Sequence, residues 1–307
     1  MNRREFFRSP TCLGSLLASG SLLAGESTGG VQEETADALA DKGGWISLFN
    51  GRSLEGWYTF LPSTGKNSDP KGVFKAEDGM IHILDIPVSA KHQEFGYLAT
   101  HQELSNCRIH AEYKWGTKRF PPREEAKRDS GLLYHFVGPD KVWPCCLEFQ
   151  IQETDTGDTW MVGGARATSN VVSDSFPMYS RSGVPQGEEG TFRAPAALQQ
   201  PYSLPLHIVT LSGGRFFKDA DFEDRTGWNS VELVLDGDRS THIVNGRIVD
   251  RTWDHRQPDP NRSGEMMVLD RGRIMLQDEG AEIWFRNIKM KPLNSNRKLS
   301  GTDPRRG

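Results

Sequence analysis

The chain has 307 residues, with 37 lysines and arginines against 41 aspartates and glutamates, which gives a formal net charge of -4. A slightly acidic chain offers no basic field for a phosphate backbone, so nucleic acid is not an expected partner. The four cysteines include Cys12 near the N-terminus, which leaves an odd set of three in the rest of the chain. Such a set is not a disulfide framework.

The N-terminus has the pattern of an export signal. Arg3 and Arg4 precede a short, glycine-broken apolar stretch over 13–24, which is too short to serve as a spanning helix. The paired arginines resemble a signal of the twin-arginine type. We expect a mature protein without a transmembrane segment, located in the periplasm or outside the cell. The expected divisions are an export signal at 1–27, a disordered spacer at 28–42, one folded domain at 43–293 and a flexible tail at 294–307.

The interval 43–293 contains no sustained apolar stripe of helical period, whereas period-two runs separated by Gly, Pro, Asn and Asp recur along it. This pattern predicts an all-β domain. In chain order, the predicted strands are 73–76, 80–83, 96–100, 107–115, 130–137, 146–153, 207–211, 230–235, 241–244, 248–250, 273–277 and 282–290. So many strands do not fit one open twisted sheet, and we therefore expect a two-sheet antiparallel jelly-roll sandwich of concanavalin-like type.

The segment from Gly163 to Arg215 is rich in Gly, Pro and Ser, and no strong strand is predicted in it before His207. Long irregular segments inside a compact domain are usually functional or mobile. We expect this segment to form one wall of a cleft.

Polar side chains gather on one face of two central strands. In 146–153, strict alternation places three polar residues on one face and the apolar residues between them on the other. The strand 130–137 adds an acidic residue and a histidine to a shared face, with an arginine just ahead of them. The residues of this surface are Arg128, Asp129, His135, Glu148, Gln150 and Gln152. A plain solvated sheet face would show the same alternation, although such residues are less common in strands than β-branched ones.

Aromatic residues suggest what this surface binds. The chain has eight tryptophans, and Trp143 directly precedes the strand that carries Glu148. An aromatic ring beside polar groups is a platform for the C–H face of a sugar. The sequence thus predicts a carbohydrate ligand on a concave sheet face, in an enzyme or in a non-catalytic carbohydrate-binding or adhesion module. The candidate substrate-binding residues are Asp129, Gln150, Gln152, Trp143, Glu112, Gln277 and Glu279.

Several short motifs span the interval from Trp45 to Leu293 in one order. They are the run from Trp45 to Trp57, Asp129-Ser130-Gly131, the run from Glu148 to Glu153, Trp228-Asn229, Asn245-Gly246, the run from Leu276 to Gly280, and Phe285-Arg286-Asn287-Ile288. In these motifs the chain resembles the bacterial 3-keto-disaccharide hydrolase domain family. The resemblance implies a concanavalin-like or jelly-roll sandwich that cleaves glycosides oxidised to a ketone at C3 of the sugar.

The residue types on the predicted polar face favour chemistry with a single base. One carboxylate and two amides on a strand cannot supply the paired acid and nucleophile of ordinary retaining hydrolysis. A 3-keto sugar needs one base, because its carbonyl acidifies the hydrogen at C2. We expect Glu148 to remove that proton, Arg128 or a metal to stabilise the enolate oxygen, and His135 to protonate the departing oxygen. Water would then add across the double bond.

No cofactor follows with certainty from the sequence. A divalent metal is an alternative to Arg128, with Asp129, His135 and Glu148 as candidate ligands. A compact ligand motif of the His-x-x-x-His kind is missing from the sequence. Asp129 is expected either to orient Arg128 or His135, or to serve as a turn residue that opens the strand.

Overall fold

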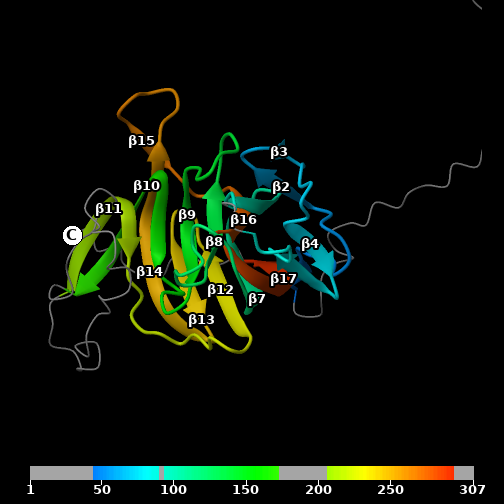
Figure 1. Ribbon diagram of the computed structural model, residues 1–307. Coiled ribbons are helices and arrows are strands. Elements are labelled where there is room, and N and C mark those ends of the chain that lie inside the picture. The colour runs from blue at the N-terminus through cyan, green and yellow to red at the C-terminus, as the bar shows by residue number, and fades with distance from the viewer. Residues whose placement is uncertain (1–43, 90–92, 173–205, 294–307) are drawn as a thin grey trace, which may run out of the picture. The chain divides into compact units, whose positions relative to one another are not determined.

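The structure is a computed structural model that describes residues 44–89, 93–172 and 206–293 (Figure 1). The expected export signal, spacer and tail lie outside these residues, as does the part 173–205 of the segment expected to form a cleft wall. Every regular element in the described part of the chain is a β-strand, which confirms the all-β prediction. The same residues contain no helix of the length and hydrophobicity needed to cross a bilayer.

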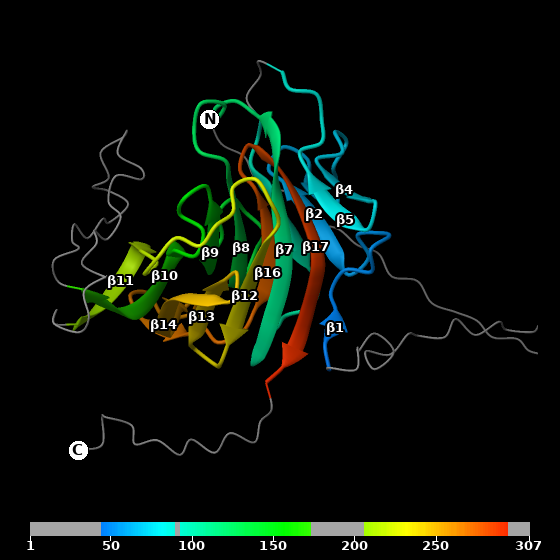
Figure 2. The ribbon, with the colours of Figure 1, turned by 90° about the horizontal axis from the view of Figure 1, so that it is seen from below.

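The strands form two antiparallel layers that are continuous through one pair of long strands (Figures 1 and 2). The first layer contains, in spatial order, β3 (Gly65–Lys66), β2 (Trp57–Leu61), β6 (Gly96–Thr100), β16 (Arg273–Asp278), β8 (Asp129–Phe136), β9 (Cys146–Gln152) and β10 (Thr159–Val172). Strand β10 also pairs with β11 (Leu206–Phe216) and with β14 (Arg247–Pro258), and β14 leads into the second layer.

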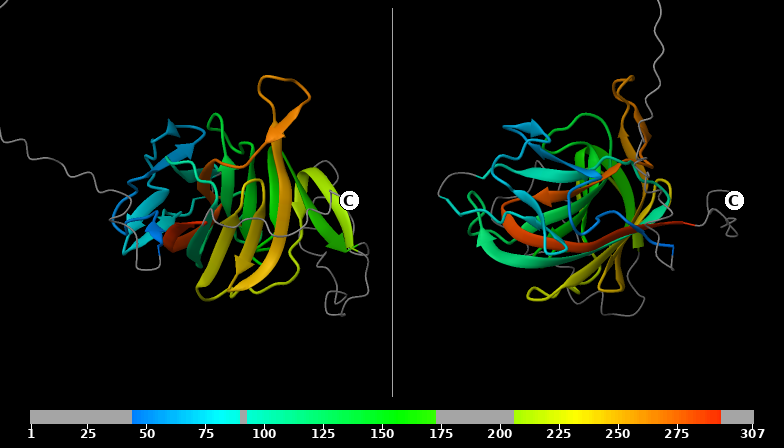
Figure 3. Two further views of the ribbon diagram at one scale, coloured as in Figure 1. Left: turned by 180° about the vertical axis from the view of Figure 1, so that it is seen from behind. Right: turned by 90° about the vertical axis from the view of Figure 1, so that its right-hand side faces the viewer.

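The second layer continues from β14 through neighbouring strands to the other edge. Its order is β13 (Ser240–Val244), β12 (Asn229–Leu235), β7 (Cys107–Arg119), β17 (Ala281–Pro292), β5 (Met80–Ile83) and β4 (Phe74–Glu77). Two short strands are added at the sides, β1 (Ile46–Ser47) on β17 and β15 (Met266–Val268) on β14. Figure 3 shows the same two layers from behind and from the side.

Apolar side chains from both layers meet in the core between them. They include Leu132, Phe149 and Leu276 from the first layer and Ile109, Leu233 and Phe285 from the second, all fully buried. Burying a large apolar side chain contributes about 1.5–3 kcal/mol, so the contact between the layers is a main source of stability. These are the positions that the period-two pattern assigns to the inner side of each strand, and the sandwich prediction is confirmed.

The predicted strands match the structure closely where their pairing is regular, and β5 and β6 agree with it at both ends. The expectation of no strong strand between Gly163 and His207 is wrong, because β10 runs on to Val172 and pairs with β11 and β14. Gly163 and Gly164 have φ values of 61° and 96°, and the register against β11 shifts beside them. This bulge breaks the alternation from which the strand would have been predicted.

A second bulge lies at the end of β8 and decides which way its last side chains point. Leu133 pairs with Met275 and Phe136 pairs with Arg273, so three steps along β8 match two along β16. His135, within this interval, has a φ of 57°. As a result Phe136, and not His135, joins Leu133 in the apolar cluster on the face away from the core.

A hydrogen-bonded group of polar side chains lies among the buried residues behind β8. The hydroxyl of Tyr134 lies 2.8 Å from Ser240 Oγ and 3.1 Å from His242 Nε2. His242 Nδ1 lies 3.0 Å from the carbonyl oxygen of Gly157, and its ring stacks on Phe149 with centroids 4.1 Å apart. Burial lowers the pKa of His242 to about 4, with the Gly157 carbonyl acting in the opposite direction.

The lowered pKa of His242 predicts a specific pH dependence of stability. The unfolded chain, with a histidine pKa of about 6.5, binds this proton more readily, so stability is lost as the pH falls from about 6.5 toward 4. In His242→Gln, we expect the drop in the free energy of unfolding between pH 7 and pH 5 to be smaller by about 2 kcal/mol. Urea unfolding at the two pH values measures this difference.

The comparison of the wild type with His242→Gln isolates the contribution of the His242 imidazole, because the other titrating groups are common to both proteins. Asp250, whose pKa is raised to about 7 by burial, changes stability in the opposite sense over part of this range in both. An identical pH dependence in the two proteins would contradict the assignment of a neutral, buried His242.

Candidate active site on the polar face

We call polar face the side of β8, β9 and β16 that points away from the core between the layers. Residues directly opposite each other in neighbouring antiparallel strands share a face. The opposite pairs on this side of β8 and β9 are Asp129 with Gln152, Gly131 with Gln150, and Leu133 with Glu148. Gln277 joins them from β16, since its Oε1 lies 3.1 Å from the place that a Cβ on Gly131 would take. The row of polar residues predicted from alternation is therefore present.

Asp129 is the centre of the hydrogen bonds on this face. Arg123 Nη2 and Gln152 Nε2 each donate to Asp129 Oδ2 at 2.5 Å, and Gln150 Nε2 donates to Oδ1 at 3.2 Å. The residue is 3% exposed. Because three donors hold this carboxylate, its role is to anchor two amide side chains, and it is poorly placed to act as a base.

Arg123 is the functional residue that the sequence did not reveal. It lies in the loop between β7 and β8, and its Nη1 also lies 3.4 Å from Glu279 Oε1 at the turn after β16. The loop follows Pro121-Pro122 and has the composition of an ordinary solvated connection. The one available signal was indirect: a carboxylate at a buried strand position requires a cationic or hydrogen-bonding partner.

Glu148 stands over Gly131 on the polar face. A Cβ on Gly131 would lie 2.4 Å from Glu148 Oε1, so a larger residue there would displace this carboxylate. Glu148 is 6% exposed, and on its other side it pairs with Trp160 of β10. The glycine of the motif Asp129-Ser130-Gly131 thus opens the space in which the glutamate is held.

Aromatic side chains border the polar face. Tyr97 and Leu133 belong to an apolar cluster on this side of the first layer, and the partly exposed rings of Trp143 and Trp160 pack against it. The rings of Phe95 and Trp143 are 14° from parallel, with centroids 6.4 Å apart. Partly exposed rings next to hydrogen-bonding groups are the arrangement expected of a sugar platform, and Trp143, the candidate from the sequence, is one of these rings.

Arg128 points away from the polar face, so the oxyanion role expected of it is wrong. Its Nη2 donates to Glu153 Oε1 at 2.6 Å, its Nη1 donates to the Gly116 carbonyl at 2.9 Å, and its guanidinium lies 5.5 Å from the Trp115 ring. The physical reason is alternation: Arg128 is one residue before Asp129, and successive side chains point to opposite sides of a strand.

His135 does not meet Glu148, and its predicted role as the acid is wrong. It is 0% exposed, with ring centroids 5.4 Å from Tyr134 and 5.7 Å from His255. Neither ring nitrogen has a hydrogen-bond partner of standard geometry among the described residues. Burial lowers its pKa to about 4, with a smaller opposing effect of the Leu269 backbone. The bulge at the end of β8 turned this side chain to the core side.

Glu112 also lies elsewhere, and its predicted place in the same cleft is wrong. It belongs to β7 in the second layer, where it accepts hydrogen bonds from Arg286 Nε and Asn287 Nδ2, each at 2.8 Å. The alternative metal ligands Asp129, His135 and Glu148 are not brought together either, because His135 lies on the core side. Of the second-rank candidates, Gln277 lies on the polar face.

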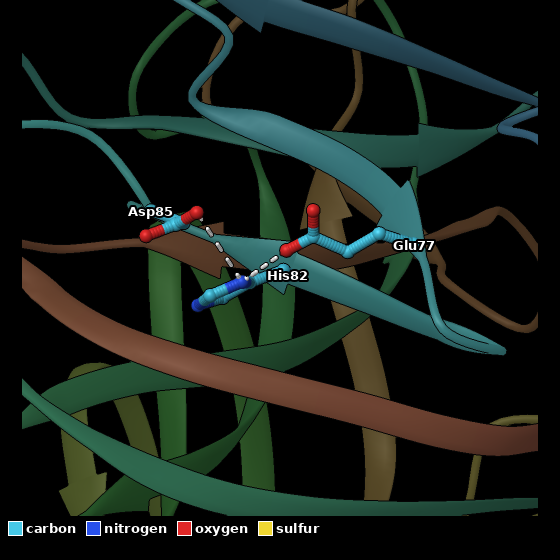
Figure 4. A group of neighbouring side chains, drawn as sticks. All are labelled: Glu77, His82 and Asp85. Carbon is cyan, nitrogen blue, oxygen red and sulfur yellow. Dashed lines mark hydrogen bonds and ion pairs between the residues drawn. The ribbon is translucent and has the colours of Figure 1, made fainter.

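One other group of side chains in the described ranges has metal-binding chemistry: Glu77, His82 and Asp85, on and next to the β4–β5 hairpin (Figure 4). His82 Nδ1 lies 2.5 Å from Glu77 Oε1 and 3.9 Å from Asp85 Oδ2. Lys118 and Lys75 both form ion pairs with Asp85 and lower its pKa to about 2. Since two ammonium groups already balance this carboxylate, the group is an ion-pair network and not a metal centre.

Fold and face together define the class of this protein: a two-layer β-sandwich with a polar, aromatic-bordered sheet face. The chain belongs to the family of 3-keto-alpha-glucoside-1,2-lyase-like domains, whose sequence model matches residues 44–291. This match confirms the resemblance seen in the sequence motifs. No match was found among curated proteins.

Solved structures with similar chain traces include two proposed glycosyl hydrolases of Parabacteroides distasonis. One is 19% identical, with 82% of this chain and 95% of that chain covered and a TM-score of 0.47. The other is 17% identical, with coverage of 81% and 99% and a TM-score of 0.45. A Bacillus licheniformis beta-glucanase is 12% identical, with coverage of 82% and 99% and a TM-score of 0.38.

The pairing of Arg123 with Asp129 predicts an unequal cost for two arginine substitutions. In Arg123→Met the Asp129 carboxylate, with a side chain only 4% exposed, loses its cation, and we expect the free energy of unfolding to fall by about 3–5 kcal/mol. The matched control is Arg262→Met, because Arg262 forms a pair with Asp259 while 66% exposed. There we expect a loss of less than about 1 kcal/mol. Urea unfolding measures both, and equal small losses would refute the anchoring role of Asp129.

Proposed function

We propose that this protein cleaves 3-keto-glycosides by enolisation, elimination and hydration at the polar face, with Glu148 as the base. One observation carries the proposal: of the two strand carboxylates on this face, Glu148 stands over Gly131, whereas Asp129 is held by three donors. Retaining and inverting hydrolysis both need two carboxyl groups in complementary roles. Enolisation of a ketone needs one base, and the family to which the chain belongs is described by that class of activity.

The reaction follows from the acidity that the C3 carbonyl gives to the hydrogen at C2. Glu148 takes this proton, and the electron pair of the C–H bond forms the enolate between C2 and C3. The C3 carbonyl then re-forms as the C1–C2 double bond is made and the bond from C1 to the glycosidic oxygen breaks. Since His135 lies on the core side, Glu148 itself returns the proton to the departing oxygen.

Hydration completes the cleavage and balances the atoms. Water adds across the C1–C2 double bond, with hydroxide at C1 and a proton at C2. The sum is the consumption of one water and the release of a free 3-keto sugar and an alcohol. Binding of the sugar is supported by Trp143 and Phe95, whose rings offer flat apolar surfaces beside the polar row.

Substitution of Glu148 tests the proposal directly. In Glu148→Gln we expect kcat for release of 4-nitrophenol from its 3-keto-glucoside to fall by roughly 10²–10⁴-fold, because the amide cannot accept the C2 proton. The thermal midpoint should change little, since the two side chains have nearly the same volume. Unchanged turnover in this variant would show that Glu148 is not the base.

The matched control is Glu153→Gln, at the residue directly after the same strand. Glu153 faces the other side and binds Arg128, so we expect a lower thermal midpoint and nearly unchanged kcat. A wild-type protein that binds glycosides but releases no alcohol from any 3-keto-glycoside would refute the enzymatic proposal in favour of a carbohydrate-binding module.

A further inference from the structure

Two amide oxygens on the polar face are buried without a donor. Gln150 Oε1 and Gln277 Oε1 have no hydrogen-bond partner among the described residues, and the two residues are 5% and 2% exposed. A buried acceptor without a donor is unfavourable, and native structures contain few of them. Two such oxygens in one small region point to a ligand that brings the donors.

The direction of the Gln150 amide is fixed by its neighbours. Its Nε2 donates to Asp129 Oδ1, and an ionised carboxylate can only accept, so the nitrogen must face Asp129 and the oxygen must face away. Arg123, bound to the same carboxylate, supplies the charge opposite to an ionised Asp129. The pair of Arg123 and Asp129 therefore determines that Gln150 presents an acceptor to a ligand.

Gly131 lies next to all three acceptor residues. Gln150 is directly opposite this glycine on β9. Gln277 Oε1 and Glu148 Oε1 would lie 3.1 Å and 2.4 Å from a Cβ at this position. A group that donates a hydrogen bond to Gln277 is thereby held next to the carboxylate that serves as the base.

We infer that Gln150 and Gln277 determine substrate specificity by accepting hydrogen bonds from two free hydroxyl groups of the keto sugar. This inference rests on the proposed function, to which it adds the class of substrate: a neutral sugar unit whose ring hydroxyls at these positions are unmodified. A hydroxyl satisfies an amide oxygen without a change of charge. A phosphate, sulfate or carboxylate there would bring an anion against three oxygen acceptors, and a missing hydroxyl would leave an amide oxygen unpaired.

The test uses a ligand that binds but has no glycosidic bond to an aglycone. The probe is 1,5-anhydro-3-keto-glucitol, which lacks an aglycone, together with its 2-deoxy, 4-deoxy and 6-deoxy forms. Kd is measured by calorimetry for the wild type, Gln277→Met and Gln150→Met. The control is Gln102→Met, a change at an exposed residue outside the polar face. We expect each of the two site variants to weaken binding of the parent probe by roughly 5- to 150-fold, and the control to leave it unchanged.

The deoxy probes show whether the lost contact is a hydrogen bond to one hydroxyl. For each site variant, one deoxy probe should bind with the same Kd as it does to the wild type, because that hydroxyl is its partner. If each variant weakens all probes by one factor, or none, while 4-nitrophenol is still released from the 3-keto-glucoside, the inference fails and the proposed function stands. If the wild type neither binds the probe nor releases 4-nitrophenol, both fail.

Discussion

The buried ion pair between Arg123 and Asp129 is the constraint on which the polar face depends. A carboxylate at a strand position almost closed to solvent is costly unless it is paired and hydrogen-bonded. Here the guanidinium supplies the opposite charge, and the amides of Gln150 and Gln152 supply two further donors. The same contacts that make the charge tolerable fix the directions of both amides. Stability and binding chemistry at this site are therefore two results of one arrangement.

Strands β8, β9 and β16 of the first layer serve both the core and the polar face. In β9, Leu147, Phe149 and Ile151 are fully buried in the core cluster, while the residues between them form the polar face. The packing of the inner side chains fixes the twist and register of the strand, and the register decides which polar groups lie opposite each other. A site built from regular strands is accordingly held more firmly than one built from loops.

The alternation of polar and apolar residues along the strands allows much of the site to be predicted from the sequence. Where this alternation is interrupted, the prediction of a residue's position is wrong. Period two was enough to place Asp129, Glu148, Gln150 and Gln152 on one face, because these positions lie in regularly paired strands. His135 was misplaced because a bulge interrupts the period at the end of β8, and bulges depend on pairing between strands that are distant in sequence.

Other errors arose from contacts that no local pattern encodes. Nearness to Asp129 in the chain predicts that Arg128 belongs to the site, although neighbouring residues in a strand point to opposite sides. Arg123 comes from an irregular loop, and its role depends entirely on where β8 brings Asp129. The fold was easier to predict because the strands are set by many apolar positions, whereas each site residue depends on one or two specific contacts.

The presence of one candidate base and the pair of amides both follow from the same carboxylate. Gln152 lies directly opposite Asp129, and a glutamate there would put like charges in a cross-strand pair, which is unfavourable. A glutamine instead donates to Asp129, and the same holds for Gln150. Once Asp129 occupies the start of β8, the neighbouring positions on β9 favour amides, and a second glutamate for paired acid and nucleophile is disfavoured. This arrangement agrees with the proposed reaction, in which one base removes the proton next to a ketone.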